Sequence, residues 1–502
     1  MQKNVIEYLV KTVKAFPDKK AVCDAEMSIT FGELWTNASR LATAIYALDL
    51  KNAPMGVYMA KGCKMVEAFA AINMSGSFYV PLDTKSPDTR VLSILTTLDA
   101  RCVITDQFHV AQLNAFFKGD VIVMEDVLAK EGDEIDLEVS LRGCIDTDPV
   151  YSIFTSGSTG APKGVVIAHR GVIDYVDWAV ETFHIDYTTI IGNQAPFYFD
   201  NSTLDIYLMY ATGATLNIIP ESCFVFPAKL IDYLNENQIN FVFWVPFVLV
   251  NVANMNILES KKPEYLRDVF FAGEVMPNKH LNYWRRCLPN CRYVNLYGPT
   301  EITVDCTYFK VDRPFSDDES LPIGVPCRNS DVIILVDRQR RAKRGEQGEL
   351  CVRGSSLALG YYNNPEKTAS SFIQNPLQYH YPEIIYCTGD IVYENERGEI
   401  MYVGRADAQI KHNGYRIELG EIETAVLGTE MVDNCCVVYD FKNKKIVLFY
   451  QSDKELNMAE FRKELSIKIP RYMFPSECHR EAILRQNNSG KIDRAYYNNL
   501  FR

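Results

Sequence analysis

Short apolar runs alternate with amphipathic segments from about Gly56 to Ala272, and this alternation restricts the possible fold more than any other feature of the chain. The apolar runs include Gly76–Pro81, Cys102–Thr105, Val121–Met124, Thr215–Ile219 and Phe241–Val245. Apolar runs of this length that alternate with helical patterns are typical of strand–helix units, whose strands form largely parallel sheets. The sequence therefore predicts an α/β fold for this part of the chain.

The pattern changes beyond Pro322, where shorter strand-like runs are separated by Gly and Pro. Gly398–Gly404 has the character of a last strand pair before a domain boundary. A chain of 502 residues is too long for one core. We therefore predict two domains, residues 1–406 and 407–502. The elements expected after Pro322 are strands at Val332–Val336, Glu349–Arg353, Val437–Tyr439 and Ile446–Tyr450 and helices at Leu419–Leu427 and Met458–Ile469.

Composition and hydropathy indicate a soluble globular protein, with 47% apolar and 23% charged residues. Residues Met1–Lys20 mix apolar residues with lysines and predict an amphipathic surface helix rather than a signal peptide. The most apolar stretch, Phe241–Val250, is too short to span a membrane and contains Pro246, so we expect a buried strand followed by a turn. These features predict a cytoplasmic protein that is not stably inserted in a membrane.

Cysteine spacing and net charge exclude two classes of function. None of the 14 cysteines forms a Cys-x-x-Cys pair, so we expect buried reduced thiols rather than a zinc site or a disulfide framework. The net charge of −12 argues against a nucleic-acid partner. From Asp407 to the end, 15 Lys and Arg stand against 14 Asp and Glu, so this segment is relatively basic and suits an acidic partner or a polyphosphate.

A glycine- and hydroxyl-rich loop, Phe154-Thr-Ser-Gly-Ser-Thr-Gly-Ala-Pro-Lys-Gly164, lies between the apolar runs Val150–Phe154 and Val165–Ala168. Its backbone amides and Lys163 are suited to an anion such as a phosphate. The spacing excludes a Walker loop, because Gly160 is followed by Ala-Pro-Lys-Gly rather than by four residues and Gly-Lys-Ser/Thr. The alternative from the residues alone is a flexible polar turn.

This loop resembles the signature loop of the adenylate-forming (AMP-binding) superfamily, and further motifs follow in that superfamily's order. The chain is similar to the amino-acid adenylation domains of nonribosomal peptide synthetases and, more closely, to the stand-alone D-alanine:carrier-protein ligases. The resemblance runs from Thr30-Phe-Gly-Glu-Leu34 to Asn488-Ser-Gly-Lys-Ile-Asp-Arg494. It implies a large N-terminal domain of two αβ-layered subdomains and a β-barrel-like subdomain, followed by a small, mobile α+β C-terminal domain.

The resemblance assigns nucleotide-binding roles to three further motifs. In Tyr297-Gly-Pro-Thr-Glu301, it places the tyrosine beside adenine, Thr300 on phosphate and Glu301 on Mg²⁺. In Tyr386-Cys-Thr-Gly-Asp390, the aspartate holds both ribose hydroxyls, and Cys387 stands where the family usually has Arg. In Gly404-Arg-Ala-Asp407, Arg405 lies near the ribose and phosphate, and Asp407 is the hinge.

The resemblance also implies a catalytic lysine, Lys491, which would stabilise charge as pyrophosphate departs, whereas the unbiased expectation is a solvated lysine. Catalysis would rest on Lys491, Thr155 and Glu301. The implied ATP-binding set is Thr155, Ser156, Gly157, Ser158, Thr159, Gly160, Lys163, Asn295, Tyr297, Gly298, Thr300, Asp390, Arg405 and Lys491.

The implied acyl pocket opens at Phe199-Asp200-Asn201-Ser202. Amino-acid-activating members of the family keep an aspartate at the position of Asp200, where it pairs with the substrate ammonium. The aligned pocket residues are Asp200, Asn201, Leu204, Phe243, Phe270, Ala272, Leu296, Val304 and Asp305. Bulky residues among them favour a small substrate such as D-alanine. The D-alanine ligases usually have Cys at the position of Ala272, and Asp305 is a second acid, so serine or another small polar amino acid stays open. Asp305 is alternatively a paired carboxylate outside the pocket.

The predicted activity is a two-step reaction with ATP and Mg²⁺. An amino acid is first adenylated and then transferred to the phosphopantetheine of an acidic carrier protein, which we expect to be a separate chain. One alternative is a carboxylic acid:CoA ligase, against which Asp200 argues. The other is a nucleotide-binding protein without chemistry, against which the joint presence of Lys163, Glu301, Asp390 and Lys491 argues.

Overall fold

The computed structural model describes residues 2–130, 132, 134–156, 162–405, 409–485 and 492–501. The chain forms two compact units. The first consists of residues 1–82, 100–153 and 165–406, and the second of residues 83–99, 154–164 and 407–502. Helix α4 (Asp88–Leu98) thus groups with the C-terminal segment rather than with its neighbours in the sequence.

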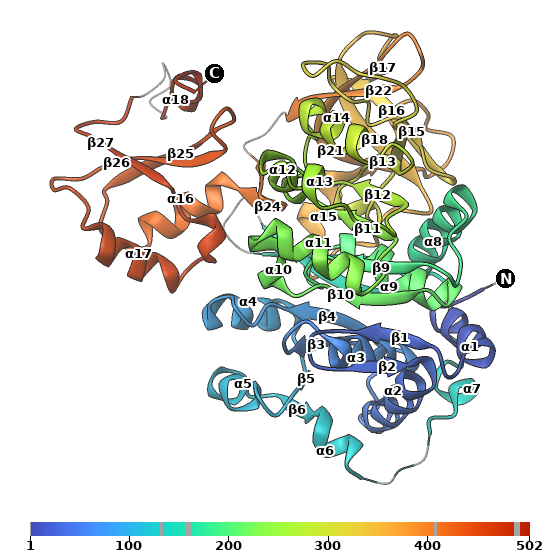
Figure 1. The fold of residues 1–502 in the computed structure, drawn as a ribbon. Coiled ribbons are helices and arrows are strands. Elements are labelled where there is room, and N and C mark those ends of the chain that lie inside the picture. The colour runs from blue at the N-terminus through green and yellow to red at the C-terminus, as the bar shows by residue number, and fades with distance from the viewer. Residues whose placement is uncertain are drawn as a thin grey trace. The chain divides into compact units, whose positions relative to one another are not determined.

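The first unit contains a mainly parallel nine-stranded sheet (Figure 1). Its strands β1, β10, β9, β11, β12 and β13 are parallel, whereas β2, β14 and β15 are antiparallel to their neighbours. The order across the sheet is β15 (Val325–Pro326), β14 (Thr307–Lys310), β13 (Arg292–Tyr297), β12 (Asp268–Phe271), β11 (Phe241–Trp244), β9 (Ile190–Asn193), β10 (Thr215–Ile218), β1 (Lys20–Cys23) and β2 (Ser28–Thr30).

A second sheet has seven strands, and the loop Phe154–Gly164 joins two that are neighbours in it. The order is β19 (Gly360–Tyr361), β8 (Lys163–Ala168), β7 (Pro149–Thr155), β4 (Phe78–Leu82), β3 (Pro54–Tyr58), β5 (Cys102–Thr105) and β6 (Asp120–Val123). The predicted alternation of strands and helices is confirmed in both sheets.

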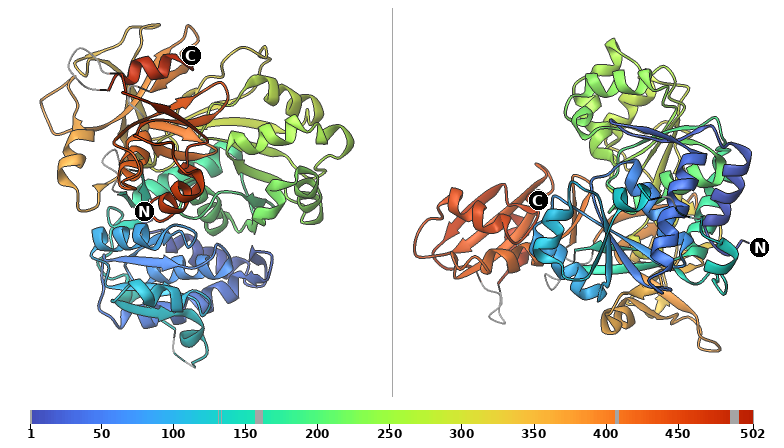
Figure 2. Two further views of the ribbon diagram at one scale, coloured as in Figure 1. Left: turned by 90° about the vertical axis from the view of Figure 1, so that its left-hand side faces the viewer. Right: turned by 90° about the horizontal axis from the view of Figure 1, so that it is seen from below.

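Two helices, α3 (Cys63–Met74) and α9 (Asn201–Thr212), are buried on almost every side. A helix that is apolar all round lies inside a layered domain rather than on its surface. One hydrophobic cluster joins residues of these helices to residues of both sheets. Helix α2 (Phe31–Tyr46) packs on α3, and α1 (Ile6–Ala15) and α8 (His169–Phe183) pack on α9. Figures 1 and 2 show this layering of helices and sheets.

Helix termini follow the local sequence. Thr30 begins α2 with a capping box, in which its side chain accepts from the Glu33 amide and the Glu33 carboxylate accepts from the Thr30 amide. The prediction of a turn after the apolar strand at residues 241–245 is wrong, because Pro246 is the first residue of helix α12 (Pro246–Asn254). Proline suits the first helical position, where its missing N–H has no intrahelical partner.

Shorter helices connect or cover the strands of the first unit: α5 (Val110–Phe116), α6 (Met124–Leu128), α7 (Leu137–Ser140), α10 (Glu221–Val225), α11 (Pro227–Glu236), α13 (Ile257–Ser260), α14 (Asn278–Cys287), α15 (Pro365–Ser371) and the 3₁₀ turn η1 (Thr300–Ile302). A third, antiparallel sheet is formed by the segment for which the barrel-like subdomain is expected. Its strands are β17 (Arg340–Arg341), β16 (Ser330–Val336), β18 (Gly348–Gly354), β21 (Ile384–Glu394) and β20 (Phe372–Gln374), and β22 (Ile400–Arg405) pairs with β21.

The C-terminal segment of the second unit has a three-stranded sheet of β25 (Asn434–Asp440), β26 (Lys445–Gln451) and β27 (Glu477–Glu481). One sheet face packs on α16 (Leu419–Leu427) and α17 (Met458–Ser466), and the other packs on α18 (Arg494–Asn499), as Figure 1 shows. A hairpin of β23 (Gln409–His412) and β24 (Tyr415–Glu418) precedes α16, and the 3₁₀ turn η2 (Arg471–Met473) precedes β27. The predicted helix Leu419–Leu427 and the α+β character of this segment are confirmed.

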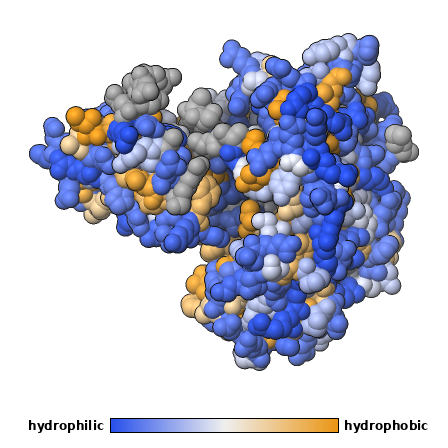
Figure 3. All heavy atoms as spheres, turned by 90° about the horizontal axis from the view of Figure 1, so that it is seen from above, coloured by the Kyte–Doolittle hydropathy of each residue, from blue (hydrophilic) through white to orange (hydrophobic). Residues whose placement is uncertain are grey.

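Hydrophilic residues cover most of the face drawn in Figure 3, where hydrophobic residues form small separate groups. Among the described helices, none is both long and apolar enough to cross a bilayer. All 14 cysteines are free thiols. Ten of them are buried, as the sequence predicts, and four are partly exposed.

Candidate functional site

The candidate site begins at the carboxyl ends of four parallel strands, β9, β11, β12 and β13. From β9 the chain continues to β10 on one side, whereas from β11 it continues to β12 and β13 on the other side. The connections therefore reverse direction between β9 and β11. In open α/β sheets, ligands bind outside the carboxyl ends of the strands at such a switch point.

Asp200 lies at this switch point because it is the N-cap residue of α9, the helix that follows β9. Its side chain makes no capping hydrogen bond to the described first turn of that helix. Burial, together with the negative charge of Asp200, raises the pKa of Tyr151 well above its ordinary value. The Nδ2 atom of the next residue, Asn201, is buried and has no hydrogen-bond partner in the described part of the chain.

The apolar residues predicted for the substrate pocket share one hydrophobic cluster. They are Leu204, Phe243, Phe270, Ala272, Leu296 and Val304, and each is at most 3% exposed. Phe243 of β11 and Phe270 of β12 are directly opposite each other. The strand order thus brings together residues that are up to a hundred positions apart in the sequence.

Asp305 is 2% exposed, and its Oδ2 atom accepts a hydrogen bond of 2.5 Å from the Tyr175 hydroxyl. Burial raises the pKa of Tyr175 well above its ordinary value, and Asp305 and Asp200 add to this effect. Two carboxylates therefore act on one tyrosine. Asp305 therefore has a hydrogen-bond partner within the protein. This agrees with the alternative that Asp305 is a paired carboxylate rather than a substrate contact.

A strained segment separates Asp305 from η1. Thr303 and Val304 both have positive φ angles, 57° and 70°, which is rare for β-branched residues and costs free energy. Thr303 is fixed by a 2.8 Å hydrogen bond from its Oγ1 to the Ser356 carbonyl. Gly298 permits the close approach of this segment, since a Cβ there would lie 2.3 Å from the Val304 carbonyl oxygen.

A second group of predicted residues meets around Asp390. The Tyr297 hydroxyl donates to Asp390 Oδ2, and Arg405 Nη1 donates to Oδ1 at 2.9 Å. Burial, and after it the Asp390 charge, raises the pKa of Tyr297 well above its ordinary value. Asn295, at the end of the same strand as Tyr297, is 7% exposed and donates to the Pro322 carbonyl at 2.8 Å.

Glu301 is completely buried in η1, beside Thr300, which is 7% exposed. Its Oε1 atom accepts a 2.8 Å hydrogen bond from the Tyr361 hydroxyl. Mg²⁺ prefers oxygen ligands, and protein Mg²⁺ sites usually combine one or two carboxylates with substrate phosphates. The Glu301 carboxylate is therefore a suitable ligand for the predicted Mg²⁺.

The remaining predicted residues belong to the second unit. Thr155 Oγ1 is buried without a hydrogen-bond partner among the described residues, and Ser156 Oγ donates to the Arg416 carbonyl at 2.7 Å. Lys163 begins β8 and is 9% exposed. Several predicted residues lie outside the described ones, namely Gly157, Ser158, Thr159, Gly160, Asp407 and Lys491.

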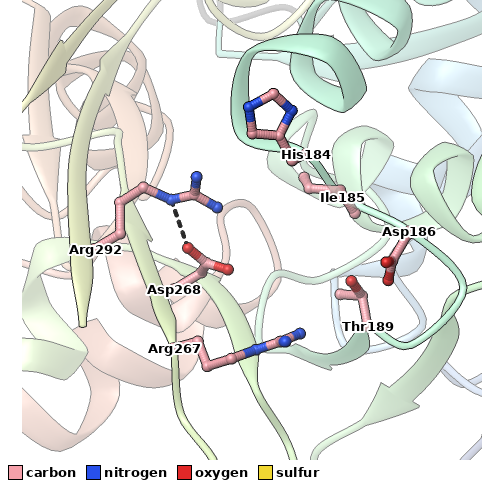
Figure 4. Close-up of a pocket in the computed structure, with 7 residues that line it drawn as sticks. All are labelled: His184, Ile185, Asp186, Thr189, Arg267, Asp268 and Arg292. Atoms are coloured by element: carbon pink, nitrogen blue, oxygen red, sulfur yellow. Dashed lines mark hydrogen bonds and ion pairs between the residues drawn. The ribbon is translucent and has the colours of Figure 1, made fainter. Parts of the chain in front are cut away.

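A cavity of about 280 Å³ opens at the opposite, amino ends of β9, β12 and β13 (Figure 4). Two of its charged side chains are paired with each other, because Arg292 Nε lies 2.6 Å from Asp268 Oδ1, and Arg292 Nη2 also donates to the Phe183 carbonyl. Ligands of parallel sheets bind at the other end of the strands. This cavity is therefore not a candidate for the predicted chemistry.

The sequence did not reveal Tyr175 and Tyr361, the hydroxyl partners of Asp305 and Glu301. Each tyrosine comes from a distant segment, so no local motif marks it. A buried acid needs a donor, and that requirement predicts a partner without identifying it.

Comparison with known proteins identifies the relatives of this chain. The family described as AMP-binding enzyme matches residues 9–362. Zwittermicin A synthase ZmaJ of Bacillus cereus is 31% identical over 98% of this chain and 94% of its own length. The D-alanine–D-alanyl carrier protein ligase of Bacillus licheniformis is 30% identical over 98% of each chain. The Vibrio cholerae adenylation domain AlmE, solved with glycyl-adenosine-5′-phosphate, shares the fold, with a TM-score of 0.85 at 21% identity over 99% of this chain and 98% of its own.

Proposed function

Because the chain belongs to the family of AMP-binding enzymes and is an ATP-dependent, AMP-forming ligase, we propose that its substrate is a small amino acid such as D-alanine. The enzyme adenylates this amino acid and transfers it to the phosphopantetheine thiol of an acidic carrier protein, which is a separate chain. It acts in the cytoplasm and consists of an adenylation core, residues 1–406, and a small domain, residues 407–502.

The position of Asp200 is the observation that carries this proposal. It stands at the start of α9, beside the switch point of the parallel sheet. Asp200 is partly exposed, and its charge acts on the buried residues Tyr151 and Tyr175, so a ligand that binds there meets a negative charge beside apolar surface. The ammonium group of an α-amino acid supplies a cation to pair with that charge, whereas a simple carboxylic acid does not.

The apolar part of the pocket favours a small side chain. Phe243 and Phe270 are opposite each other and completely buried, so they occupy volume that a larger substrate would need. Ala272 follows β12 in the same cluster. AlmE was solved with a glycyl adenylate, and the Bacillus ligase is named for D-alanine, so both relatives are associated with small amino acids.

The Tyr297–Asp390–Arg405 group supports a nucleoside site. A carboxylate that accepts two donors matches the two hydroxyls of ribose. Tyr297 and Arg405 already donate to Asp390, so the bound nucleotide would replace one or both of these contacts. Asn295, at the end of the same strand as Tyr297, would bind the adenine.

Phosphate binding would involve Thr155, Ser156, Lys163, Thr300 and the glycine-rich loop. Mg²⁺ at Glu301 would neutralise phosphate charge. An oxygen of the amino-acid carboxylate attacks the α-phosphorus, the bond to the β-phosphate oxygen breaks, and pyrophosphate leaves. Lys491 stabilises the developing charge. Positioning and charge neutralisation are sufficient for such an in-line attack.

The second step needs a different arrangement. We propose that the small domain turns about Asp407, so that Lys491 leaves and Gly414 with its neighbours faces the incoming thiol. The sulfur attacks the acyl carbon of the adenylate, the thiol proton is released, and AMP leaves. A hinge of this kind lets one site serve two reactions.

The direct test is amino-acid-dependent exchange of pyrophosphate into ATP, with a panel of small D- and L-amino acids. We expect exchange with D-alanine and a loss of at least about 100-fold in Lys491→Ala, the size of a missing transition-state donor. Exchange with no amino acid, or full exchange in Lys491→Ala, would refute the proposal. Consumption of CoA with simple acids would instead indicate a carboxylic acid:CoA ligase.

Serine or another small polar amino acid is the second candidate, and Asp305 favours it. This acid lies next to Val304 and bonds Tyr175, and it could accept a second hydrogen bond from a substrate hydroxyl or amine. Exchange in Asp305→Asn distinguishes the candidates. A loss specific to serine supports the polar substrate, whereas an equal effect on alanine and serine supports the structural role of the Asp305–Tyr175 pair.

A further inference from the structure

Two cysteines lie opposite each other on adjacent strands of the third sheet of the first unit, close in sequence to Asp390. Cys351 of β18 and Cys387 of β21 are directly opposite residues in an antiparallel pair. Their Sγ atoms are 3.6 Å apart. Directly opposite residues in antiparallel strands have Cα atoms about 4.5–5.5 Å apart, which is within the range that a disulfide requires.

The surroundings of the two thiols are apolar, with Ile333, Leu335 and Ile385 in the same small cluster. Cys351 is 0% exposed and Cys387 is 6% exposed. The hydrogen bond from Cys351, aided by the nearby Arg338 guanidinium, lowers the pKa of Cys387, whereas the pKa of Cys351 is raised. Cys387 is thus the sulfur that ionises first, and Cys351 is placed to react with it.

The pair is mechanically connected to Asp390. Cys351 pairs with Cys387, and Glu349, two residues earlier on β18, pairs with Ile391. These partners are four residues apart on β21, so β21 bulges between them. Gly389, with a φ of 74°, and Asp390 lie in this bulge. The bulge is held by Glu349, which accepts from the Gly389 amide at 3.0 Å.

The same group offers three ligand atoms to a metal ion, since Glu349, Cys351 and Cys387 are within 4.8 Å of one another. The carboxylate is committed elsewhere, because both of its oxygens pair with Arg338 at 2.6 and 2.9 Å. A structural zinc site needs four ligands. The geometry therefore favours a bond between the sulfurs over a metal between them.

We propose that Cys351 and Cys387 form a reversible disulfide that controls nucleotide binding at Asp390. With a peroxide as oxidant, the Cys387 thiolate attacks a peroxide oxygen and becomes a sulfenic acid as hydroxide leaves. The Cys351 sulfur then attacks the Cys387 sulfur, and its proton combines with the departing hydroxide to give water. In total, two thiols and one H₂O₂ give one disulfide and two H₂O, and a small dithiol reverses the reaction.

Closing the bond changes the bulge. The sulfurs must approach from 3.6 Å to about 2.0 Å, so the two side chains rotate and the backbone of β21 adjusts at Cys387, next to the bulge that holds Asp390. We expect the disulfide form to bind ATP more weakly. This consequence rests on the proposed role of Asp390, whereas the formation of the disulfide does not.

The first experiment maps disulfides in the intact protein. The purified chain is treated with H₂O₂ or with dithiothreitol, its free thiols are blocked by alkylation, and its peptides are analysed by mass spectrometry. We expect a Cys351–Cys387 cross-linked peptide after oxidation that disappears after reduction. It should be absent in Cys351→Ser and present in Cys144→Ser, which removes another buried thiol. Unlinked thiols, irreversible oxidation, or protection from alkylation that a chelator relieves would overturn the proposal.

The second experiment measures pyrophosphate–ATP exchange in the reduced and oxidised protein. We expect the KM for ATP to rise about tenfold on oxidation, as a displacement of about 1 Å in a positioning group allows, with the KM for the amino acid unchanged. Cys351→Ser should keep the reduced value under both conditions. A disulfide without a change in the KM for ATP would overturn the control of nucleotide binding, and inactivity of the reduced protein would instead refute the proposed function.

Discussion

At the scale of single residues, the candidate pocket depends on where a few carboxylates are placed. Asp200 and Asp305 both raise the pKa of Tyr175, but their surroundings differ. Asp305 has a tyrosine hydroxyl as its partner, whereas Asp200 stands at the opening of a helix at the sheet's switch point. The two acids should therefore respond differently to the same substitution.

Replacing Asp200 by Asn removes the charge and keeps the shape. Loss of one partner of a charge pair that the bound substrate covers costs about 2–5 kcal/mol, so the KM for the amino acid should rise by about 100-fold. The KM for ATP should not change. Steady-state exchange kinetics with each substrate varied in turn measure both constants. A KM for the amino acid within threefold of the wild-type value would exclude the ammonium contact.

Replacing Gly298 by Ala places a methyl group 2.3 Å from the Val304 carbonyl oxygen and 2.5 Å from the Asp305 Cα. Both contacts are with backbone, so the strained segment must move, and overpacking of this kind costs about 1–3 kcal/mol. We expect a lower Tm and a loss of exchange. Gly132→Ala is the matched control, since no described atom lies within 4 Å of its added methyl. Wild-type exchange in Gly298→Ala would mean that Val304 and Asp305 do not shape the pocket.

At the scale of elements, short apolar runs predicted strands, and an amphipathic pattern predicted helices. The helix Leu419–Leu427 and the strand Cys102–Thr105 are confirmed to the residue. Helices α3 and α9 are buried on nearly all sides, so their sequences carry no polar face that would mark them. The Cys351–Cys387 pair was equally invisible, because strand register is set by contacts between distant segments.

Burial of an acid in α3 has a consequence for stability. Glu67 is 2% exposed and accepts a 2.7 Å hydrogen bond from Asn37, and burial raises the pKa of Glu67 to about 7. The folded protein therefore keeps a proton that the unfolded chain loses near its ordinary pKa of 4.5. The stabilisation by this proton is complete below pH about 4.5 and is lost as the pH rises through about 7.

Glu67→Gln should therefore gain stability relative to the wild type as the pH rises. The difference in free energy of unfolding should increase by about 3 kcal/mol between pH 4.5 and pH 8, because each pKa unit is worth about 1.4 kcal/mol. Urea unfolding of both proteins across this range measures the difference. Exposed Glu366→Gln serves as the control. A difference that is independent of pH would show that Glu67 ionises normally.

At the scale of the whole molecule, the chain divides into units with separate cores. The hydrophobic clusters of the C-terminal segment consist entirely of residues between Ile410 and Phe501. The sequence predicts a boundary between residues 406 and 407, but it gave no sign that α4 groups with the C-terminal segment. The candidate site residues were chosen from the order of motifs along the chain. Their hydrogen-bond partners, such as Tyr175 and Tyr361, are brought to them by the fold and have no motif of their own.

The fragment of residues 407–502 should fold by itself, because both faces of its sheet are covered by its own helices. We expect a cooperative thermal transition in circular dichroism and a dispersed amide spectrum in NMR. The same fragment with Leu448→Asp, which places a charge in the larger of these clusters, should remain unfolded. A disordered wild-type fragment would show that residues 83–99 and 154–164 are needed for this unit.

The pairing of β1 with β10 also means that β1 must wait for its partner strand during protein synthesis. Strand β1 is made among the first residues, but its parallel partner β10 follows roughly 190 residues later. At ribosomal rates, this interval lasts on the order of 10–40 seconds. Throughout it the edge of β1 that later pairs with β10 is open, and an open strand edge is a template for wrong pairing with other nascent chains. The first thirty residues of this enzyme are therefore a segment that a chaperone would protect while the ribosome is still at work.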